Sequence, residues 1–415
     1  MKIATSWASA SDQTSIEKAY SALEQQLGGT PNYLYLSCSV EDSIEEISRA
    51  LKKLAPHIPL HGSTSCLGSM TEQGVHNQDG RGIAIFGILD PVGGYGVGAA
   101  QIQHDAKTAA KEAVEAALAM ADCPGEVPSM VWMTSAPGHE EAAIAGIAEI
   151  LGDDVPVTGG SSADNTVSGL WKQCVQDRIY TNAVVLTVLF PSTEVIFAFH
   201  SGYEPTEQKG VVTKMGALDN EGNLDESALE GRMVLEIDHR PAMEVYNEWC
   251  GGILNDVVST GGNILTRTTL YPLGRVAGHV GKIPYFQLSH PDSATERGAF
   301  TAFSNICVGD ELVLMHGTVE SLITRAGRVA ASTLDTHGID HKDIAGALVV
   351  YCAGCMLTVR ERLGEVVDGL KQALPQTPFL GIYTFGEQGC FLGGENRHGN
   401  LMISVLLFRK SETTF

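Results

Sequence analysis

The chain has 415 residues, of which 44% are apolar, and its formal net charge at pH 7 is -22. This composition is typical of a folded protein rather than a disordered one, and the length suggests two or three domains. The negative charge argues against nucleic acid or anionic lipid as partners, so we expect neither a nucleic acid nor a membrane.

Three further features favour a cytoplasmic location. The best apolar run, AVVLTVLF at 183–190, is far shorter than the roughly eighteen residues that a membrane helix needs. The N-terminus, MKIATSWASASD, lacks the apolar stretch of a secretory signal. The nine cysteines are unevenly spaced, which argues against a disulfide framework and for a reducing compartment.

One pattern occurs three times along the chain: a β-prone run, a helical pattern, a short strand that a proline precedes, a glycine turn, and a second β-prone run. The strands are expected at 32–38 and 82–89, at 129–135 and 182–190, and at 346–352 and 400–408, with helices over about 40–54, 139–151 and 358–374. A strand, a helix and a further buried strand form the βαβ pattern of parallel or mixed sheets.

The spacing inside the copies indicates a duplication. The turn glycines Gly62 and Gly159 each follow the last residue of the first strand, Cys38 or Ser135, by 24 residues. In the third copy Gly381 follows Cys352 by 29 residues, because the helix is longer. Matched spacing of this kind is typical of internal repeats.

The segments between the copies complete the prediction. GGYGVG at 93–98 lies between β-prone runs and predicts a glycine-rich hairpin rather than a dinucleotide site, and the chain has no P-loop motif. The polar, acidic stretch 204–231 indicates a linker or an elaborated hairpin near a domain boundary. After it we expect a strand that turns into a helix at Pro241, and then short strands at 283–290, 298–309 and 310–317, with Gly309-Asp310 as a hairpin signal.

The fold class that follows is α/β, with α+β character at the margins. We expect two domains, residues 1–225 and 226–415, with mixed sheets on which helices pack and which are built from the repeated strand–helix–strand units.

The repeat also predicts where a ligand would bind. In open α/β sheets ligands bind beyond the carboxyl ends of the strands, where the marked Cys or Ser and the glycine turn of each copy fall. Glycine permits close approach, and Ser and Thr hydroxyls offer donors and acceptors without charge, which suits a small polar ligand better than bond-breaking chemistry. The candidate ligand-binding residues are Gly62, Ser63, Thr64, Gly159, Gly160, Ser161, Cys352, Gly386 and Glu387. The alternative is that these glycines only make tight turns and the hydroxyls only cap helices.

Cys352-Ala-Gly-Cys355 is the only CxxC in the chain. It is open to three interpretations: buried inert thiols, a redox pair, or half of a zinc site completed by Cys390 and His398. An enzyme would use Cys352 or Cys38 as nucleophile or Glu387 as base, but no Ser-His-Asp or Cys-His-Asn order stands at a recognisable spacing. We therefore assign no catalytic residue.

Six stretches, in order, resemble the FIST family, in which a FIST N and a FIST C domain adjoin. They are HGSTSCLG (61–68), VPVTGGSSADN (155–165), EIDHRPAMEVY (236–246), NICVGDELVLM (305–315), ALVVYCAGCM (347–356) and FLGIYTFGEQGCF (379–391). The resemblance implies a FIST N-like domain over 1–225, a FIST C-like domain over 226–415, and a sensory module that binds a small ligand such as an amino acid and signals through a partner protein.

Some stand-alone members of the family look like haem-binding nitric oxide sensors that act with a histidine kinase, which makes haem the alternative ligand. The chain departs from the family pattern at His239, where a glycine is usual, and at Cys355, where an arginine often follows the CxG. The candidate haem ligands are His239 and Cys352. No other metal site or cofactor is predicted.

Overall fold

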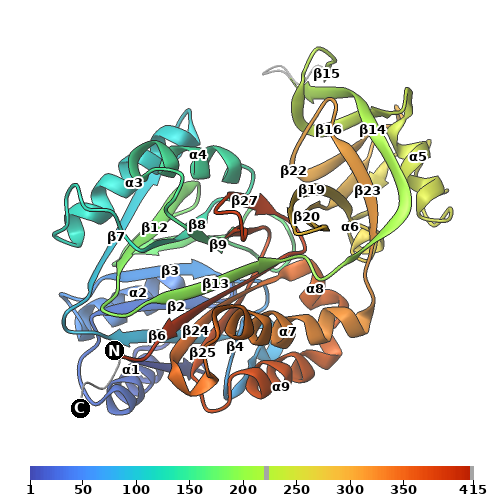
Figure 1. The fold of residues 1–415 in the computed structure, drawn as a ribbon. Coiled ribbons are helices and arrows are strands. Elements are labelled where there is room, and N and C mark those ends of the chain that lie inside the picture. The colour runs from blue at the N-terminus through green and yellow to red at the C-terminus, as the bar shows by residue number, and fades with distance from the viewer. Residues whose placement is uncertain (219–223, 412–415) are drawn as a thin grey trace.

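The computed structural model describes residues 1–218 and 224–411 (Figure 1). Three similar units follow one another, and each consists of a strand, a helix, a strand, a helix, a strand, a hairpin and a final strand. Unit 1 comprises β1 (Lys2–Ala8), α1 (Gln13–Leu27), β2 (Tyr33–Cys38), α2 (Ile44–Leu54), β3 (Leu60–Thr64), β4 (Ser69–Thr71), β5 (Gly74–His76) and β6 (Ile83–Leu89). The repeat predicted from the sequence is therefore confirmed, although the prediction omitted the first strand and the first helix of each copy.

Unit 2 repeats the same order of elements. It comprises β7 (Gly94–Gln101), α3 (Ala106–Met120), β8 (Met130–Ser135), α4 (Glu140–Leu151), β9 (Val157–Gly160), β10 (Gln173–Val175), β11 (Arg178–Tyr180) and β12 (Ala183–Phe190). The first helix of every unit begins at a side-chain cap. Asp12, Asp105 and Thr318 accept hydrogen bonds from backbone N–H groups of the first turn of α1, α3 and α7.

Unit 3 is interrupted after its first strand. It comprises β13 (Val195–His200) and then, after the interruption, α7 (Val319–His337), β24 (Ile344–Cys352), α8 (Ala353–Thr358), α9 (Leu363–Ala373), β25 (Phe379–Thr384), β26 (Glu387–Cys390), β27 (Asn396–Gly399) and β28 (Ile403–Arg409). Residues 204–316, which we call the inserted domain, fold into a separate lobe at the upper right of Figure 1.

The inserted domain is built on one antiparallel sheet. Its elements are β14 (Glu204–Leu218), β15 (Leu224–Asp225), β16 (Glu230–Ile237), β17 (Arg240–Pro241), α5 (Ala242–Trp249), β18 (Gly262–Asn263), α6 (Leu265–Thr268), β19 (Leu273–Val280), β20 (Ile283–Ser289), β21 (Pro291–Ala294), β22 (Phe300–Cys307) and β23 (Glu311–His316). The strand that turns into a helix at Pro241 is confirmed. The stretch 204–231, expected as a linker or an elaborated hairpin, contains β14, which pairs antiparallel with β15 and β16. Its residues 219–223 lie outside the described residues.

The three units form three sheets with the same strand order. The orders are β1-β6-β2-β3, β7-β12-β8-β9 and β13-β28-β24-β25, and in each the last two strands run parallel while the others run antiparallel. One face of each sheet is covered by its own helices, and the other faces a core that all three sheets share. Tyr35, Trp132 and Leu348 lie in this shared core, one from each unit. Because both faces are buried, central strands such as β6 (IAIFGIL) and β12 (AVVLTVLF) are almost continuously apolar.

Each sheet is extended by a hairpin from another unit. The β10–β11 hairpin of unit 2 pairs with β3, the β26–β27 hairpin of unit 3 pairs with β9, and the β4–β5 hairpin of unit 1 pairs with β25. The exchange closes a ring, since every unit gives one hairpin and receives one. A strand edge that would otherwise stay unpaired is covered in each sheet.

The predicted glycine turns do not form. The repeated glycines Gly62, Gly159 and Gly381 lie inside β3, β9 and β25 and not in turns. The missing side chain leaves room for neighbours: a Cβ on Gly62 would lie 2.5 Å from Cys174 Sγ on the incoming hairpin. A glycine in a strand often marks such a close approach.

The two predicted hairpins do not form either. GGYGVG opens β7, which belongs to a different sheet from β6, and Gly309-Asp310 joins β22 to β23, which are separated in the sheet by β16 and β14. The glycines of β7 have another purpose, because α3 lies directly on them. A Cβ on Gly96 or Gly98 would lie 2.0 or 1.9 Å from the Ala117 or Ala113 carbonyl oxygen.

The fold class is confirmed: the chain is an α/β protein of two domains with mixed sheets, packed helices and repeated units. Residue 225, where we expected the domain boundary, ends β15 within the inserted domain. Within the described residues no helix is long and apolar enough to cross a membrane.

Gly98→Ala tests the contact between β7 and α3. We expect a loss of roughly 1–3 kcal/mol of unfolding free energy, because α3 must move away from the added methyl group. The matched control is Gly364→Ala in α9, where a Cβ would meet nothing within 4 Å and should be neutral or slightly stabilising. Thermal unfolding of both variants decides, and an unchanged midpoint for Gly98→Ala would contradict the packing described.

Candidate functional site

The carboxyl ends of the parallel strand pairs meet, as the repeat predicted. Backbone hydrogen bonds join the three ends in a ring: Ala163 N–H donates to the Thr64 carbonyl, Phe385 N–H to the Ser161 carbonyl, and Cys66 N–H to the Tyr383 carbonyl, at 3.0, 3.2 and 3.0 Å. The ends therefore support one another, and only part of the ring is open to a ligand.

The end of unit 1 is closed. Gly62, Ser63 and Thr64 lie in β3 and are fully buried. The Ser63 hydroxyl pairs with the Tyr35 hydroxyl at 2.7 Å, and Thr64 Oγ1 accepts from the Lys172 N–H at 2.9 Å. These three candidates hold the hairpin of unit 2 in place and line no described cavity.

The end of unit 2 is tied to a buried ion-pair network. Gly160 packs against Thr384, and Gly159 lies against the Met133 carbonyl, so both glycines serve close packing between strands. The Ser161 hydroxyl donates to Glu140 Oε1 at 2.6 Å. Ser161 thus positions a carboxylate that the sequence analysis did not single out.

Arg232 of the inserted domain completes this network. Its Nη2 donates to Glu140 Oε2 at 2.9 Å and to Glu141 Oε2 at 2.8 Å. Burial alone would raise the pKa of Glu140, but the charges of His398 and Arg232 and the Ser161 hydrogen bond hold it below its usual range. One guanidinium therefore fastens the inserted domain to the start of α4.

The same cluster is the one place among the described residues where three potential metal ligands converge. Ligand atoms of Glu140, Glu141 and His398 lie within 4.8 Å of one another. Arg232 already supplies the positive charge there, so the cluster is an ion-pair network rather than a metal site. Cys352 and Cys355 form no such group with Cys390 or His398, and the zinc interpretation of the CxxC finds no support in the described part of the chain.

The end of unit 3 holds a buried carboxyl group. Glu387 opens β26 and accepts hydrogen bonds from the Thr384 hydroxyl at 2.8 Å and the Met402 N–H at 2.9 Å. Burial raises the pKa of Glu387 to about 8, more than these hydrogen bonds lower it. Gly386 packs against the His398 ring and leaves no room for a side chain.

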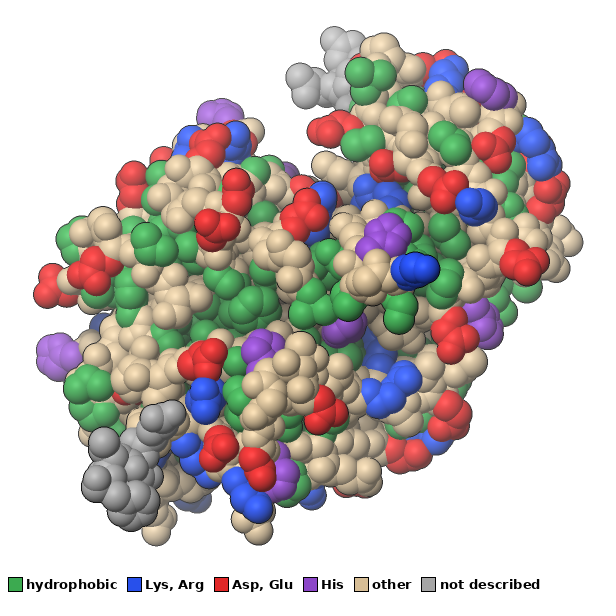
Figure 2. Space-filling view, viewed as in Figure 1, with side chains coloured by type: hydrophobic (Ala, Val, Ile, Leu, Met, Phe, Trp, Pro, Cys, Tyr) green, Lys and Arg blue, Asp and Glu red, His purple; other side chains and the backbone are tan. Residues whose placement is uncertain are grey.

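A cavity of about 440 Å³ opens beside this end, where unit 2, unit 3 and the inserted domain meet. Unit 3 contributes Cys352, Gly354, Leu357, Thr384, Phe385 and Asn400; unit 2 contributes Gly138, Glu140, Val167 and Trp171; the inserted domain contributes Arg232, Leu265, Thr269, His290 and Phe303. In the space-filling view the inserted domain stands apart from unit 2 across a deep hollow (Figure 2). Ligand sites commonly lie at such interfaces between domains.

The walls of the cavity are largely apolar, and its polar groups come from few positions. Val167 and Leu357 remain half exposed at the cavity, and Trp171 stands edge-on to Phe385. The Asn400 amide oxygen accepts from the His290 N–H, but its Nδ2 is buried and has no partner among the described residues. Because a buried amide donor without a partner costs free energy, Asn400 is suited to hydrogen-bond a ligand.

His290 contributes a second polar edge. Its Nε2 lies 3.1 Å from the Leu265 carbonyl, to which it donates, and its ring lies close to Gly354. Burial lowers the pKa of His290 to about 4, so the ring is neutral at physiological pH and its Nδ1 keeps a lone pair. Asn400 and His290 therefore offer a donor and an acceptor next to each other.

Of the nine predicted ligand-binding residues, the cavity includes only Cys352. The residues that sequence reasoning missed are Asn400, His290, Arg232 and Glu140. Asn400 stands just before a strand of the third copy and Glu140 just after a strand of the second, which was a usable signal. Nothing local marks Arg232 or His290, because the inserted domain brings them to the cavity.

Two family models match the chain. The FIST N domain model matches residues 32–240, and the FIST C domain model matches residues 242–390. The chain belongs to the FIST family. FIST domains are associated with signal transduction and with binding of small ligands.

Other comparisons add little. No curated protein matches the chain. Among solved structures, cyanuric acid hydrolase from A. caulinodans is 10% identical, with 99% of each chain covered and a TM-score of 0.39. PurLQS from Thermotoga maritima is 10% identical, with 94% of this chain and 82% of that chain covered and a TM-score of 0.21. Similarities this weak carry no argument about function.

Both FIST domains contribute to the cavity. The FIST N range includes its unit 2 wall and Arg232, and the FIST C range includes His290, Phe303, Cys352 and Phe385. A ligand in the cavity would therefore contact both FIST domains at once.

The haem alternative does not fit these residues. His239 lies on the exposed turn between β16 and β17 and is not part of the cavity. Burial raises the pKa of Cys352 well above its usual value, which disfavours the thiolate that iron would need. Burial also raises the pKa of Cys38, so both cysteines that were considered as nucleophiles are thiols rather than thiolates at rest.

Arg232→Met tests the joint between the domains. We expect a loss of roughly 3 kcal/mol in the unfolding free energy, because Glu140 is left buried without its cation. The control is Arg240→Met, which removes an exposed pair with Glu248 and should leave the thermal midpoint unchanged. Equal midpoints for the two variants would show that Arg232 does not fasten the domains.

Glu387→Gln tests the buried carboxyl group. The folded pKa lies above the unfolded one, so the folded state binds the extra proton and the wild type should lose stability as the pH rises from about 4.5 through about 8. The glutamine variant has no proton to lose there, and we expect a smaller fall in thermal midpoint between pH 6 and pH 9. Glu395→Gln, an exposed change in the same hairpin, should behave as the wild type does. Parallel pH dependence in all three proteins would contradict a protonated Glu387.

Proposed function

We propose that this protein is a sensory module that binds a small metabolite in the cavity between its FIST N and FIST C domains. The observation that carries the proposal is the cavity itself. It is about 440 Å³ in volume, within the range of small-molecule sites, and it combines apolar walls with the unpartnered Asn400 amide.

The chemistry of the walls defines the ligand class. Trp171, Phe303 and Phe385 suit an apolar body, while Asn400 and His290 suit a polar end that both accepts and donates hydrogen bonds. An amino acid with an apolar side chain, or a related metabolite, meets both requirements. A ligand of this kind agrees with the small polar metabolite expected from the repeat.

The position of the cavity supports a mechanism of signalling. The inserted domain forms one wall. It is joined to unit 3 by the backbone connections at 200–204 and 316–319, and it contacts unit 2 through the Arg232 ion pairs and a hydrogen bond from the Asn305 N–H to Glu141 Oε1. A ligand that contacts both sides would favour one arrangement of the two domains over others. The surface that the protein offers to a partner protein would change with that arrangement. The nine unpaired cysteines support a reducing cytoplasm as the place where the two proteins meet.

A thermal-shift screen against amino acids and related metabolites tests the proposal. A ligand at one hundred times its Kd should stabilise the folded state by about 2.7 kcal/mol. Gly354→Leu should abolish the shift, because a Cβ at this position has room but the rest of the side chain enters the cavity.

The controls separate the cavity from the other candidates. Gly364→Leu in α9 adds the same side chain away from the cavity and should keep the shift, as should Ser63→Ala in β3 and His239→Ala. The proposal fails if no metabolite stabilises the protein, or if Gly354→Leu binds as the wild type does. A Soret band on addition of haem that His239→Ala abolishes would favour the haem alternative instead.

A further inference from the structure

Behind the cavity lies a buried arginine without a carboxylate partner. Arg325 of α7 is 1% exposed, and its Nη1 donates to the carbonyls of Ser201 and Leu401 at 2.9 and 2.8 Å. Its Nε and Nη2 have no hydrogen-bond partner, and no ion pair among the described residues includes it. The guanidinium lies over the rings of Tyr203 and Tyr351, at 5.6 and 5.1 Å. Since arginine keeps its charge when buried, an anion is required close by.

The groups around Arg325 that can carry this negative charge are few. They are Tyr203, Tyr351, Glu387 and the two cysteines of the CxxC. Burial raises the pKa of both tyrosines and of Cys352, and it raises that of Glu387 to about 8. Burial would also raise the pKa of Cys355, but the hydrogen bond from Cys352, the charge of Arg325 and the hydrogen bond from Tyr203 lower it to about 6. Cys355, whose sulfur lies 3.5 Å from the Tyr203 hydroxyl beneath Arg325, is therefore the group best suited to carry the negative charge.

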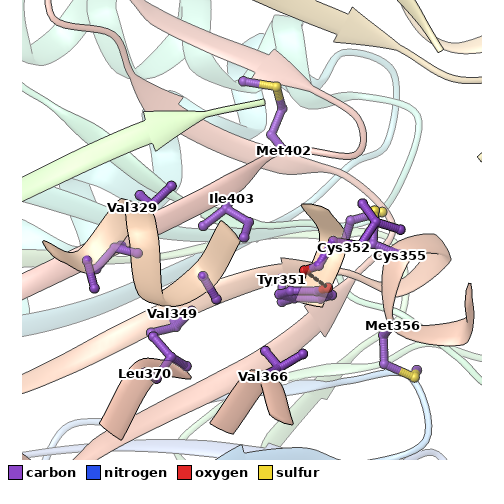
Figure 3. Close-up of a cluster of buried hydrophobic side chains, with 14 of the residues drawn as sticks. Val329, Val349, Tyr351, Cys352, Cys355, Met356, Val366, Leu370, Met402 and Ile403 are labelled. Carbon is purple, nitrogen blue, oxygen red and sulfur yellow. Dashed lines mark hydrogen bonds between the residues drawn. The ribbon is translucent and has the colours of Figure 1, made fainter. Parts of the chain in front are cut away.

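The two cysteines lie at different depths behind the wall of the cavity. Cys352 ends β24 and lines the cavity, whereas Cys355 in α8 lies behind it and is fully buried. Their sulfur atoms lie side by side in Figure 3, and the Cys352 thiol donates a hydrogen bond to the Cys355 sulfur. The Tyr203 hydroxyl lies 3.5 Å from the Cys355 sulfur on the other side. A small molecule in the cavity can reach Cys352 first and Cys355 only through it.

We propose that Cys352 and Cys355 are a reversible dithiol–disulfide pair that a small hydroperoxide oxidises through the cavity. This adds an input to the protein that does not depend on the proposed metabolite. Disulfides that form in reducing compartments are typically transient and redox-sensing, which agrees with a pair held next to a cavity.

The first step oxidises Cys352. Its proton passes along the existing hydrogen bond to Cys355, and the Cys352 thiolate attacks one peroxide oxygen, so that an S–O bond forms and the O–O bond breaks. The alkoxide that leaves takes the proton back from Cys355 and departs as an alcohol. Cys352 is now a sulfenic acid, and Cys355 is again a thiolate.

The second step closes the disulfide. The Cys355 thiolate attacks the Cys352 sulfur, the S–S bond forms, the S–O bond breaks, and the hydroxide that leaves takes the Glu387 proton and becomes water. Two thiols have lost two electrons and the peroxide has gained them. The negative charge has moved from Cys355 to Glu387, so Arg325 keeps an anion in both states.

The negative charge that Glu387 gains lies within an element that joins two units. Glu387 is the first residue of β26, the strand that unit 3 contributes to the sheet of unit 2, and its carboxyl group holds the Met402 N–H. Oxidation therefore changes the charge at the root of an exchanged hairpin that lies next to the cavity.

The reduced full-length protein, treated with one equivalent of tert-butyl hydroperoxide, provides the test. After alkylation and digestion, mass spectrometry should find a disulfide between Cys352 and Cys355, two of the nine thiols lost, and both restored by dithiothreitol. In Cys355→Ser, which lacks both the group that takes the Cys352 proton and the second thiol of the disulfide, Cys352 should stay reduced and dimedone should trap no sulfenic acid. Cys390→Ser, which removes another buried thiol of unit 3, should oxidise as the wild type does.

A measurement without oxidant keeps the test independent of folding defects. Below pH 8 the ultraviolet absorbance of thiolate in the wild type should rise in one step with a midpoint near pH 6, because burial raises the pKa of the other eight cysteines. Cys355→Ser should lack this step and Cys390→Ser should keep it. The proposal is overturned if Cys352 and Cys355 stay reduced while the half-buried Cys123 and Cys307 are oxidised, if the disulfide forms only in denaturant, or if no thiolate appears below pH 8.

Discussion

The backbone hydrogen bonds between β3 and β10, β9 and β26, and β25 and β4 are the constraint on which the rest of the structure depends. They pair each sheet with a hairpin of another unit, so no unit has a complete sheet of its own. Since an unpaired strand edge is costly to bury and prone to pair with other chains, the exchange makes the three units one body. It also brings the three strand ends into a ring at the centre of the molecule.

The three sheets also share one hydrophobic core, to which each sheet contributes its inner face. Their inner faces meet at residues such as Tyr35, Trp132 and Leu348, while the helices cover the outer faces. A sheet buried on both faces loses its solvent-exposed side, which leaves the strand ends and the loops beyond them as the surface for binding. At the end of unit 1 the exchanged segment closes this surface. A cavity remains where the ends of units 2 and 3 meet the inserted domain.

Two arginines, the partly buried Arg232 and the fully buried Arg325, set the electrostatics on either side of that cavity. Arg232 is neutralised by two glutamates and fastens the inserted domain, so it acts as a structural cation. Arg325 has no carboxylate and instead holds the CxxC, whose outer cysteine faces the cavity.

The sequence determined the repeated strand–helix–strand units, the α/β class and the FIST family, because these follow from hydrophobic periodicity and from local motifs. It placed the binding region at the strand ends, and Cys352 lies in the cavity there. It misread Gly62, Gly159 and Gly381 as turns, since local sequence does not show that a strand from another unit will pack on a glycine. Only the tertiary structure decided the hairpin exchange and which groups lie next to each buried charge. It also decided the positions of His290, Arg232 and Asn400. They depend on contacts between residues far apart in the chain, such as Val157 with Asn396 and Cys66 with Tyr383, and such contacts leave no trace in any local window of the chain.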